Sequence, residues 1–349
     1  MLKKLSALPI DTFLLAMAAT VALAGLFPAR GAFAGVMSVA AKVVIALLFW
    51  LYGARLSPQQ AWQGVKRWQL HLLVLATTFV VFPVLGLAAR GLVPWLLNLN
   101  LYNGLLFLCL VPSTVQSSIA FTSIARGNVS AALVSASLSN IVGIALTPLL
   151  VVLLMNTSGG TRMDATAVRD VVVQLLLPFV AGQLMRPWIA DWVARHTVLT
   201  KAVDRGSILL VVYTAFSMGM VEHIWRSVNA WQLAIVAVVN AVLLAVVLAF
   251  TWLVGRVAGL DRGDSIVLLF CGSKKSLASG LPMALVFFPA ATVGVIMLPL
   301  MIFHQIQLVV CSVIASRLSR DSLDDEPAAA ASLRLTSIGW VASIDSGCG

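Results

Sequence analysis

The stretch FCGSKKSLASGLP, residues 270–282, places two adjacent lysines inside a segment that otherwise has the composition of a lipid-buried helix. The sequence before it, residues 265–269, is SIVLL, and the sequence after it, residues 283–303, is MALVFFPAATVGVIMLPLMIF. A single charge at the middle of a bilayer costs at least ~2.5–3.5 kcal/mol on insertion scales. Lys274 and Lys275 therefore indicate a specific need for positive charge at this depth.

The composition predicts an all-α polytopic membrane protein. The chain has 349 residues, of which 60% are hydrophobic and 10% charged, whereas a soluble domain carries roughly 25% charged residues. The apolar runs are continuous, which favours helices over the alternating strands of a barrel. A span needs about 20 residues, and we expect ten transmembrane helices, at roughly 9–27, 33–54, 69–89, 101–125, 129–155, 168–187, 204–220, 231–256, 264–288 and 291–316.

The distribution of basic residues predicts the orientation. With the N-terminus in the cytoplasm, 15 of the 23 Lys and Arg residues lie inside and 5 outside, and three lie within spans. By the positive-inside rule, we expect both termini on the cytoplasmic side of the plasma (inner) membrane. Orientation explains the net charge of +10, so no nucleic-acid partner is needed. A signal peptide ending near residues 32–34 is the alternative for the first apolar run.

Two spans share an internal pattern. LCLVPSTVQSSIAFTSIARGN in span four and LFCGSKKSLASGLPMALVF in span nine each have a Pro or Gly break followed by small hydroxyl residues. Ser113 and Ser273 lie 160 positions apart, and five spans in each half make the second half inverted. Interrupted helices at matching positions of inverted halves indicate a transporter's binding site. The alternative interpretation is tight helix packing through small residues.

This pattern divides the chain into three parts. We expect a first five-helix repeat at 1–155, an inverted second repeat at 156–318, and a disordered cytoplasmic tail at 319–349. The tail is predicted from its polar, Ala- and Ser-rich composition.

The acidic residues argue against a cation carrier based on carboxylates. All thirteen fall in loops, in the tail or at the ends of the expected spans, so no carboxylate lies at mid-membrane. The charges at mid-membrane are positive, and half-helix N-termini add partial positive charge. Both features favour an anionic substrate, or a site where a lysine ammonium replaces a bound metal cation. Adjacent helical residues point about 100° apart, and of the two lysines we expect Lys275 to face the site.

No cofactor or metal centre is predicted. The four cysteines show neither a CxxC spacing nor a disulfide framework. His304 in span ten either lines the cavity or bridges helices.

The stretches PSTVQSSIAFTSIARGNVSAALVSASLSNIVGIALTP and CGSKKSLASGLPMA resemble the bile acid:sodium symporter superfamily, in its SBF-like orphan branch. The resemblance covers residues 5–318. It implies two inverted five-helix repeats, a panel domain (spans 1, 2, 6 and 7) and a core domain (the others), with helices 4 and 9 discontinuous and crossing. Family members move organic anions, such as bile acids, by elevator-like alternating access, and sodium-coupled members bind sodium near the crossing.

The resemblance also implies site residues. Ser117 and Ser118 match the family's hydroxyl/amide pair, and Asn128 matches the turn after span four. Ser273 stands where the sodium symporters carry a glutamate, so the sodium site lacks its carboxylate. The predicted substrate- and ion-binding residues are Ser113, Thr114, Gln116, Ser117, Ser118, Asn128, Ser135, Ser139, Asn140, Ser273, Lys274, Lys275, Ser276 and His304.

The sequence thus predicts a secondary transporter of a small organic anion, with an intramembrane lysine in place of the coupling sodium. Two alternatives remain: a non-transporting regulatory or scaffold membrane protein, and a sodium-coupled symporter of bile-acid type. An enzyme is not expected, because Asp264 has no partner aspartate and no Ser–His pair lies at facing depths. The expected partners are the anion and the lipid bilayer, and the oligomeric state is left open.

Overall fold

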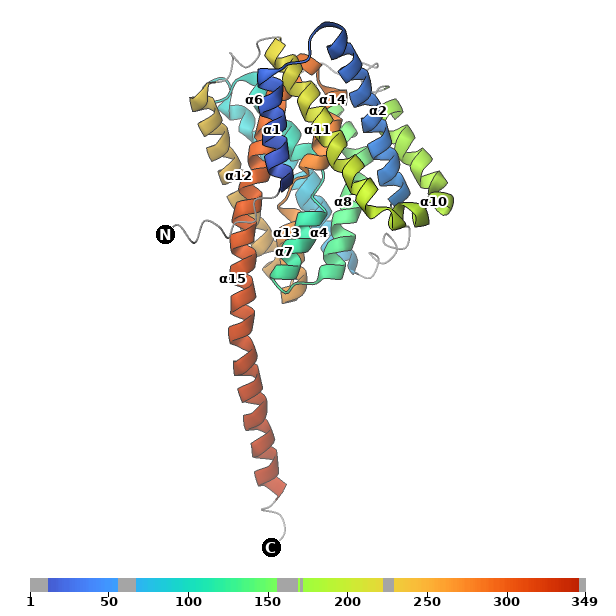
Figure 1. The fold of residues 1–349 in the computed structure, drawn as a ribbon. Helices are drawn as coiled ribbons and strands as arrows, with labels where there is room; N and C mark the ends of the chain where they lie inside the picture. The colour runs from blue at the N-terminus through green and yellow to red at the C-terminus, as the bar shows by residue number, and fades with distance from the viewer. Residues whose placement is uncertain (1–11, 56–66, 156–168, 170–171, 222–228, 345–349) are drawn as a thin grey trace.

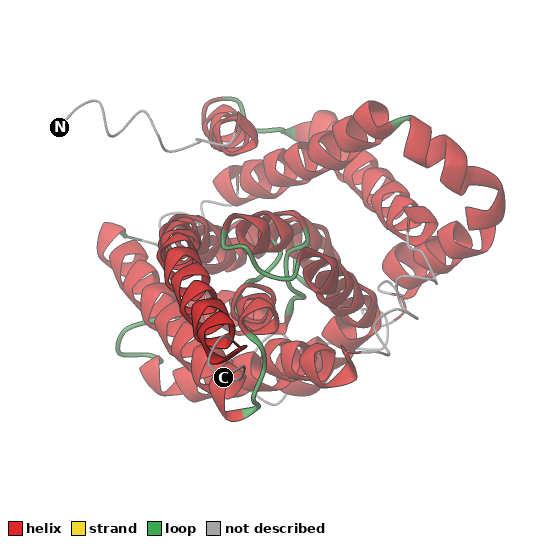
Figure 2. Cartoon of the chain, turned by 90° about the horizontal axis from the view of Figure 1, so that it is seen from below, coloured by secondary structure: helices red, strands yellow, loops and turns green. Residues whose placement is uncertain are grey.

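A computed structural model describes residues 12–55, 67–155, 169, 172–221 and 229–344, and all regular structure within these ranges is helical (Figures 1 and 2). The predicted all-α class is therefore confirmed for the described part of the chain. Within it, six segments are long and apolar enough to cross a membrane: Gly31–Arg55, Trp68–Leu92, Val129–Met155, Val172–Arg195, Ala230–Val257 and Thr292–Arg320. The arrangement as ten spans in two inverted repeats stays a prediction.

The described helices follow one another in this order along the chain. In the first half they are α1 (Thr12–Leu26), α2 (Gly31–Arg55), α4 (Trp68–Ala76), the π-helical turn η3 (Thr77–Val81), α5 (Phe82–Ala88), the 3-10 turn η4 (Ala89–Leu92), α6 (Leu99–Leu110), α7 (Gln116–Ile124), α8 (Val129–Leu150) and η5 (Val151–Met155). In the second half they are η6 (Val172–Leu176), α10 (Leu177–Arg195), α11 (Thr197–Val221), α12 (Ala230–Val257), α13 (Arg262–Gly272), α14 (Leu277–Phe287) and α15 (Ala290–Ile344).

Two short non-helical segments, the breaks, lie inside the body of the molecule. Break 1 is residues 111–115, between α6 and α7, and break 2 is residues 273–276, between α13 and α14. Pro112 restricts the residue before it to extended backbone, and Val111 accordingly has ψ of 155° and ends α6. Break 2 ends where the Ser276 hydroxyl accepts a hydrogen bond from the backbone N–H of Ser279, an N-cap that starts α14.

Glycines allow very close helix contacts around these elements. A Cβ on Gly53 of α2 would lie 2.0 Å from the carbonyl oxygen of Phe179 in α10. A Cβ on Gly104 of α6 would lie 2.1 Å from the carbonyl oxygen of Ile296 in α15. Small residues at such crossings are the usual way in which helix backbones approach one another in lipid. The second contact places the middle of α6 against α15.

Helix α15 continues past the body of the molecule, where it forms the long extension toward the C-terminus in Figure 1. The described backbone of this segment is helical through Ile344, and its run of alanines has high helix propensity. The division of the chain at residue 318, with a disordered tail at 319–349, stays a prediction. Residues 345–349 lie outside the described residues.

Gly104→Ala tests the contact between α6 and α15. Because the added methyl group would overlap a backbone carbonyl, we expect a loss of about 2–3 kcal/mol in the free energy of unfolding. Thermal unfolding of the purified protein in detergent measures the change.

The matched control is Gly35→Ala in α2, where an added Cβ meets nothing within 4 Å. This variant should be unchanged or more stable by about 0.5–1 kcal/mol, because alanine loses less backbone entropy on folding. Equal unfolding temperatures for both variants would contradict the close approach of α6 to α15.

Candidate functional site

The two breaks lie against each other and exchange hydrogen bonds. The backbone N–H of Ser276 in break 2 donates to the carbonyl of Pro112 in break 1, at 2.8 Å. The hydroxyl of Ser113 donates to the carbonyl of Cys271 at the end of α13, at 2.6 Å. Helix ends leave backbone groups without intrahelical partners. Each break therefore satisfies open backbone groups of the other.

The ammonium of Lys275 is fully buried and bound by three backbone carbonyls. Its Nζ donates to the carbonyl oxygens of Thr78, Cys109 and Val111, at 2.9, 2.8 and 2.9 Å. It also lies 4.1 Å from the centre of the Phe82 ring, a cation–π contact. An ammonium has three N–H donors, so all three are used. The charge that the sequence placed at mid-membrane is thus held by backbone oxygens.

The carbonyls that bind Lys275 come from irregular points of the backbone. Cys109 and Val111 lie at the C-terminal end of α6, where carbonyls lack a partner and the helix dipole is negative. Thr78 lies in η3, a π-helical turn of the kind that often occurs at functional sites. These oxygens form an environment that favours a cation.

Gln307 of α15 binds the peptide groups of Lys275. Its Oε1 accepts from the backbone N–H of Lys275, and its Nε2 donates to the carbonyl of the same residue, both at 2.9 Å. Gln307 is fully buried, and its Nε2 also lies 2.9 Å from Nδ1 of His304. One side-chain amide therefore replaces the helical partners that break 2 removes.

Asn140 of α8 has the corresponding role at break 1. Its Nδ2 donates to the carbonyl of Ser113 at 2.8 Å, and its Oδ1 accepts from the hydroxyl of Ser279 in α14 at 2.9 Å. The hydroxyl of Ser139 accepts from the backbone N–H of Ser113, at 3.1 Å. Each break is thus held by an amide side chain from the long helix that follows it.

Lys274 is also fully buried, in different surroundings. Its Nζ donates to the carbonyl of Ser117 at 2.9 Å and lies 3.8 Å from the ring centre of Phe121 and 5.4 Å from that of Phe270. The hydroxyl of Ser118 donates to the carbonyl of Phe270, at 3.1 Å. Among the described contacts, this ammonium uses one donor for a hydrogen bond, where Lys275 uses three.

The remaining predicted residues near the breaks make local contacts. The Thr114 hydroxyl lies 2.6 Å from that of Ser117. Ser273 is buried and donates to the carbonyl of Leu269 in its own helix. Gln116 is exposed on α7.

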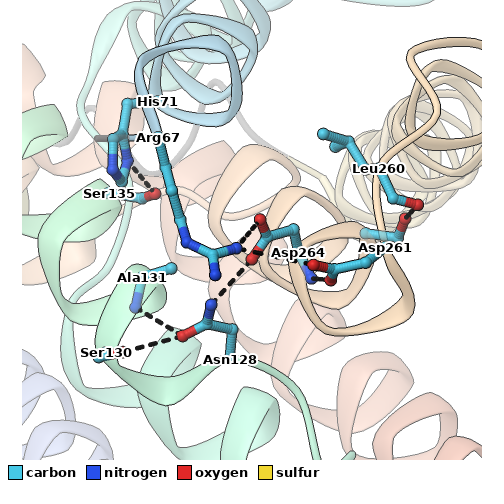
Figure 3. Close-up of polar contacts among 10 residues, drawn as sticks. Arg67, His71, Asn128, Ser130, Ala131, Ser135, Leu260, Asp261 and Asp264 are labelled. Atoms are coloured by element: carbon cyan, nitrogen blue, oxygen red, sulfur yellow. Dashed lines mark hydrogen bonds and ion pairs between the residues drawn. The ribbon is translucent and has the colours of Figure 1, made fainter. Parts of the chain in front are cut away.

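Asn128 and Ser135 belong to a second cluster, at the N-terminal ends of α4, α8 and α13 (Figure 3). Asp264 is buried there and accepts from Arg67 and, at 2.9 Å, from Nδ2 of Asn128. The bond to Asp264 raises the pKa of Arg67 above its ordinary value. One turn further along α4, Nδ1 of His71 lies 2.7 Å from the hydroxyl of Ser135. The structure therefore divides the predicted residues between two clusters.

Sequence reasoning did not identify Arg67, His71 or Asp264 as site residues. Asp264 is the third residue of α13, and the Asp261 side chain caps its backbone N–H at 2.7 Å. This Asp-x-x-Asp spacing at a helix start is a signal that the sequence contains. Arg67 carries no comparable signal, because its partner is 197 residues away.

Three relatives of known sequence are similar to this chain over most of its length. An uncharacterized protein of Pseudomonas aeruginosa is 50% identical over 321 residues, 92% of this chain and 96% of the relative. YfeH of Escherichia coli, whose name marks it as a candidate symporter, is 48% identical, over 90% of this chain and 94% of its own. Sodium/bile acid cotransporter 7-A of Xenopus laevis is 27% identical, over 78% of this chain and 80% of its own.

Residues 11–320 match the sequence model of a protein family. That family consists of transporters and not of enzymes. This match confirms the resemblance found in the sequence and the prediction that the protein is not an enzyme. With its apolar helices, the chain is an integral membrane protein. The chain belongs to the SBF-like CPA transporter family.

Proposed function

We propose that the protein is a secondary transporter of a small organic anion, in which the ammonium of Lys275 takes the place of a coupling sodium ion. The observation that carries the proposal is the cage of three carbonyl oxygens around that ammonium. Backbone carbonyls at interrupted helices are the ligands that coordinate sodium in many transporters. Here a charge fixed to the chain occupies such a position.

The proposed architecture is ten spans in two inverted repeats, 1–155 and 156–318. Helices α6 and α7 form one discontinuous span, α13 and α14 form the other, and the two cross at the breaks. The hydrogen bonds between the breaks support this arrangement. So does the matching use of Asn140 and Gln307, each on the long helix after its break.

A separate panel domain is proposed from the helix contacts. Helix α2 packs against α10 and α11, and α1 packs against α11. These four helices would correspond to spans 1, 2, 6 and 7. The remaining helices would form the core domain that carries both breaks.

Lys274 is the residue that we assign to the substrate. Its ammonium has donors to spare, whereas those of Lys275 are all bound to backbone oxygens. The N-termini of α7 and α14 begin at the breaks and add partial positive charge. An anion fits these surroundings. The name of the relative from Xenopus laevis, a sodium/bile acid cotransporter, supports an organic anion.

Burial of the site supports alternating access. Lys274, Lys275 and Ser113 have no exposed surface. A substrate reaches them only when helices move apart, first toward one side of the membrane and then toward the other. The threefold excess of basic residues on one side supports placing both termini in the cytoplasm, with the protein in the plasma (inner) membrane.

Lys275→Ala tests the replacement of sodium by an ammonium. The variant leaves three buried carbonyls without donors, and we expect a loss of roughly 3–5 kcal/mol in the free energy of unfolding. A sodium ion can bind those oxygens, so sodium should restore part of the stability of the variant. Thermal unfolding in sodium chloride and in choline chloride of equal ionic strength measures both effects.

The wild-type protein should unfold at the same temperature in both salts. Lys42→Ala is the matched control, because Lys42 is an exposed lysine in the middle of α2. It should show neither the loss nor the rescue. If sodium stabilises the wild type, the result favours a sodium-coupled symporter and contradicts the proposal that the Lys275 ammonium replaces sodium.

Lys274→Met tests the binding of the anion. We expect a carboxylated or sulfated organic anion to raise the unfolding temperature of the wild type without sodium, because ligands that bind the folded state stabilise it by mass action. At a ligand concentration of 100 times Kd, the gain is about 2.7 kcal/mol. Lys274→Met should lose this gain, and Lys42→Ala should keep it.

The same anions separate the alternatives. Uptake of the stabilising anion into proteoliposomes would distinguish a transporter from a scaffold protein. If no anion in a panel of bile acids, sulfated steroids and dicarboxylates stabilises the wild type, the assignment of an organic anion is wrong.

A further inference from the structure

The amide of Gln307 can lie in one orientation only. The backbone N–H of Lys275 needs an acceptor, which must be Oε1, and the carbonyl of Lys275 needs a donor, which must be Nε2. Rotating the amide by 180° would oppose donor to donor and acceptor to acceptor at both contacts. The peptide groups of Lys275 therefore fix which end of the Gln307 amide faces His304.

This orientation fixes the role of His304. Nε2 of Gln307 uses one hydrogen for the carbonyl of Lys275, and its second hydrogen points to Nδ1 of His304, 2.9 Å away. Nδ1 must then be the acceptor, so the neutral ring carries its proton on Nε2. A second proton on His304 would go to Nδ1 and would oppose two N–H donors at 2.9 Å.

We propose that His304 is a proton-binding residue, and that its protonation breaks the two hydrogen bonds between the Gln307 amide and the backbone N–H and carbonyl of Lys275. Gln307 cannot satisfy a protonated His304 and both peptide groups of Lys275 at once. The protonated ring therefore favours a state in which the Gln307 amide no longer forms hydrogen bonds with the Lys275 backbone in break 2. Gln307 is a positioning residue for Lys275, and His304 controls it.

His304 is half-buried, whereas Gln307 is fully buried, and the inference requires that the exposed part of the His304 ring exchange protons with water. Helix α15 packs against α6, α7, α11, α12 and α14. In these helices α7 and α14 contain no ionisable side chain, and the others contain Tyr102, Cys109, Lys201, Asp204, Arg205, Tyr213 and Arg256. Lys274 and Lys275 in break 2, and Cys311, Arg317 and Arg320 of α15 itself, are further ionisable groups that can modify the response.

For the transport cycle, the inference rests on the proposed function. There, the protonation switch, which is His304 together with the Gln307 amide, would couple proton binding to a change at break 2. A proton that binds His304 would break the hydrogen bonds of Gln307 to the Lys275 backbone in break 2, and loss of that proton would restore them. The ion that drives the transporter would then be a proton.

The test is hydrogen–deuterium exchange of the full-length protein in detergent, read by mass spectrometry on peptides that contain Lys275. The measurement is made on either side of the range in which imidazoles titrate, at roughly pH 8 and roughly pH 5.5, with rates corrected for the intrinsic effect of pH. In the wild type we expect the corrected exchange of the Lys275 amide to rise about tenfold at acid pH, as for the loss of one hydrogen bond.

His304→Gln should abolish this rise, because its side chain cannot take up a proton. His71→Gln is the matched control, since His71 is a buried histidine bound to Ser135 and not to break 2. It should keep the rise. Peptides of α13 that exchange as in the wild type at pH 8 show that each variant is folded.

The inference is overturned if the wild type shows no rise, or if His304→Gln retains it. Anion binding at neutral pH is a separate measurement. If an anion binds and the switch is absent, the transporter assignment stands and the role of His304 falls. If the switch is present and no anion binds, the proposed function falls and the control of Gln307 by His304 stands.

Discussion

The contact between the ammonium of Lys275 and three carbonyl oxygens is the interaction on which the centre of the molecule depends. Interrupting a helix inside a membrane exposes backbone groups where water cannot satisfy them. Placing a charge there is also costly. The structure solves both problems together, because the lysine supplies the donors that the open carbonyls need. Break 1, η3 and break 2 are joined at this one nitrogen atom.

Side-chain chemistry made part of this site predictable from the sequence. Two lysines in an apolar run, and a matching polar break 160 residues earlier, indicated both non-helical segments. The partners of Lys275 could not be predicted, because they are backbone oxygens of Thr78, Cys109 and Val111. A carbonyl has no residue signature, and its availability depends on where a helix ends or changes its hydrogen bonding.

The assignment of Asn128 and Ser135 shows a second limit. The family resemblance implied Asn128 as the turn after span four, and Ser135 and Asn140 as part of the polar stretch of span five, so all three were predicted to belong to one site. Asn128 lies 12 residues before Asn140, which is about 18 Å along a helix at 1.5 Å per residue. Composition indicates a polar helix, but depth decides which cluster each side chain joins. Gln116, which was predicted with them, is the first residue of α7 and is exposed.

A cation that is covalently attached to the chain has an energetic consequence. A dissolved ion can bind on one side of a membrane and leave on the other, and its concentration gradient then performs work. The ammonium of Lys275 cannot leave, so its occupancy is independent of the salt in the surrounding medium. Under the proposed replacement of sodium by this ammonium, transport would not depend on the sodium concentration of the medium, and a sodium gradient could not supply its free energy.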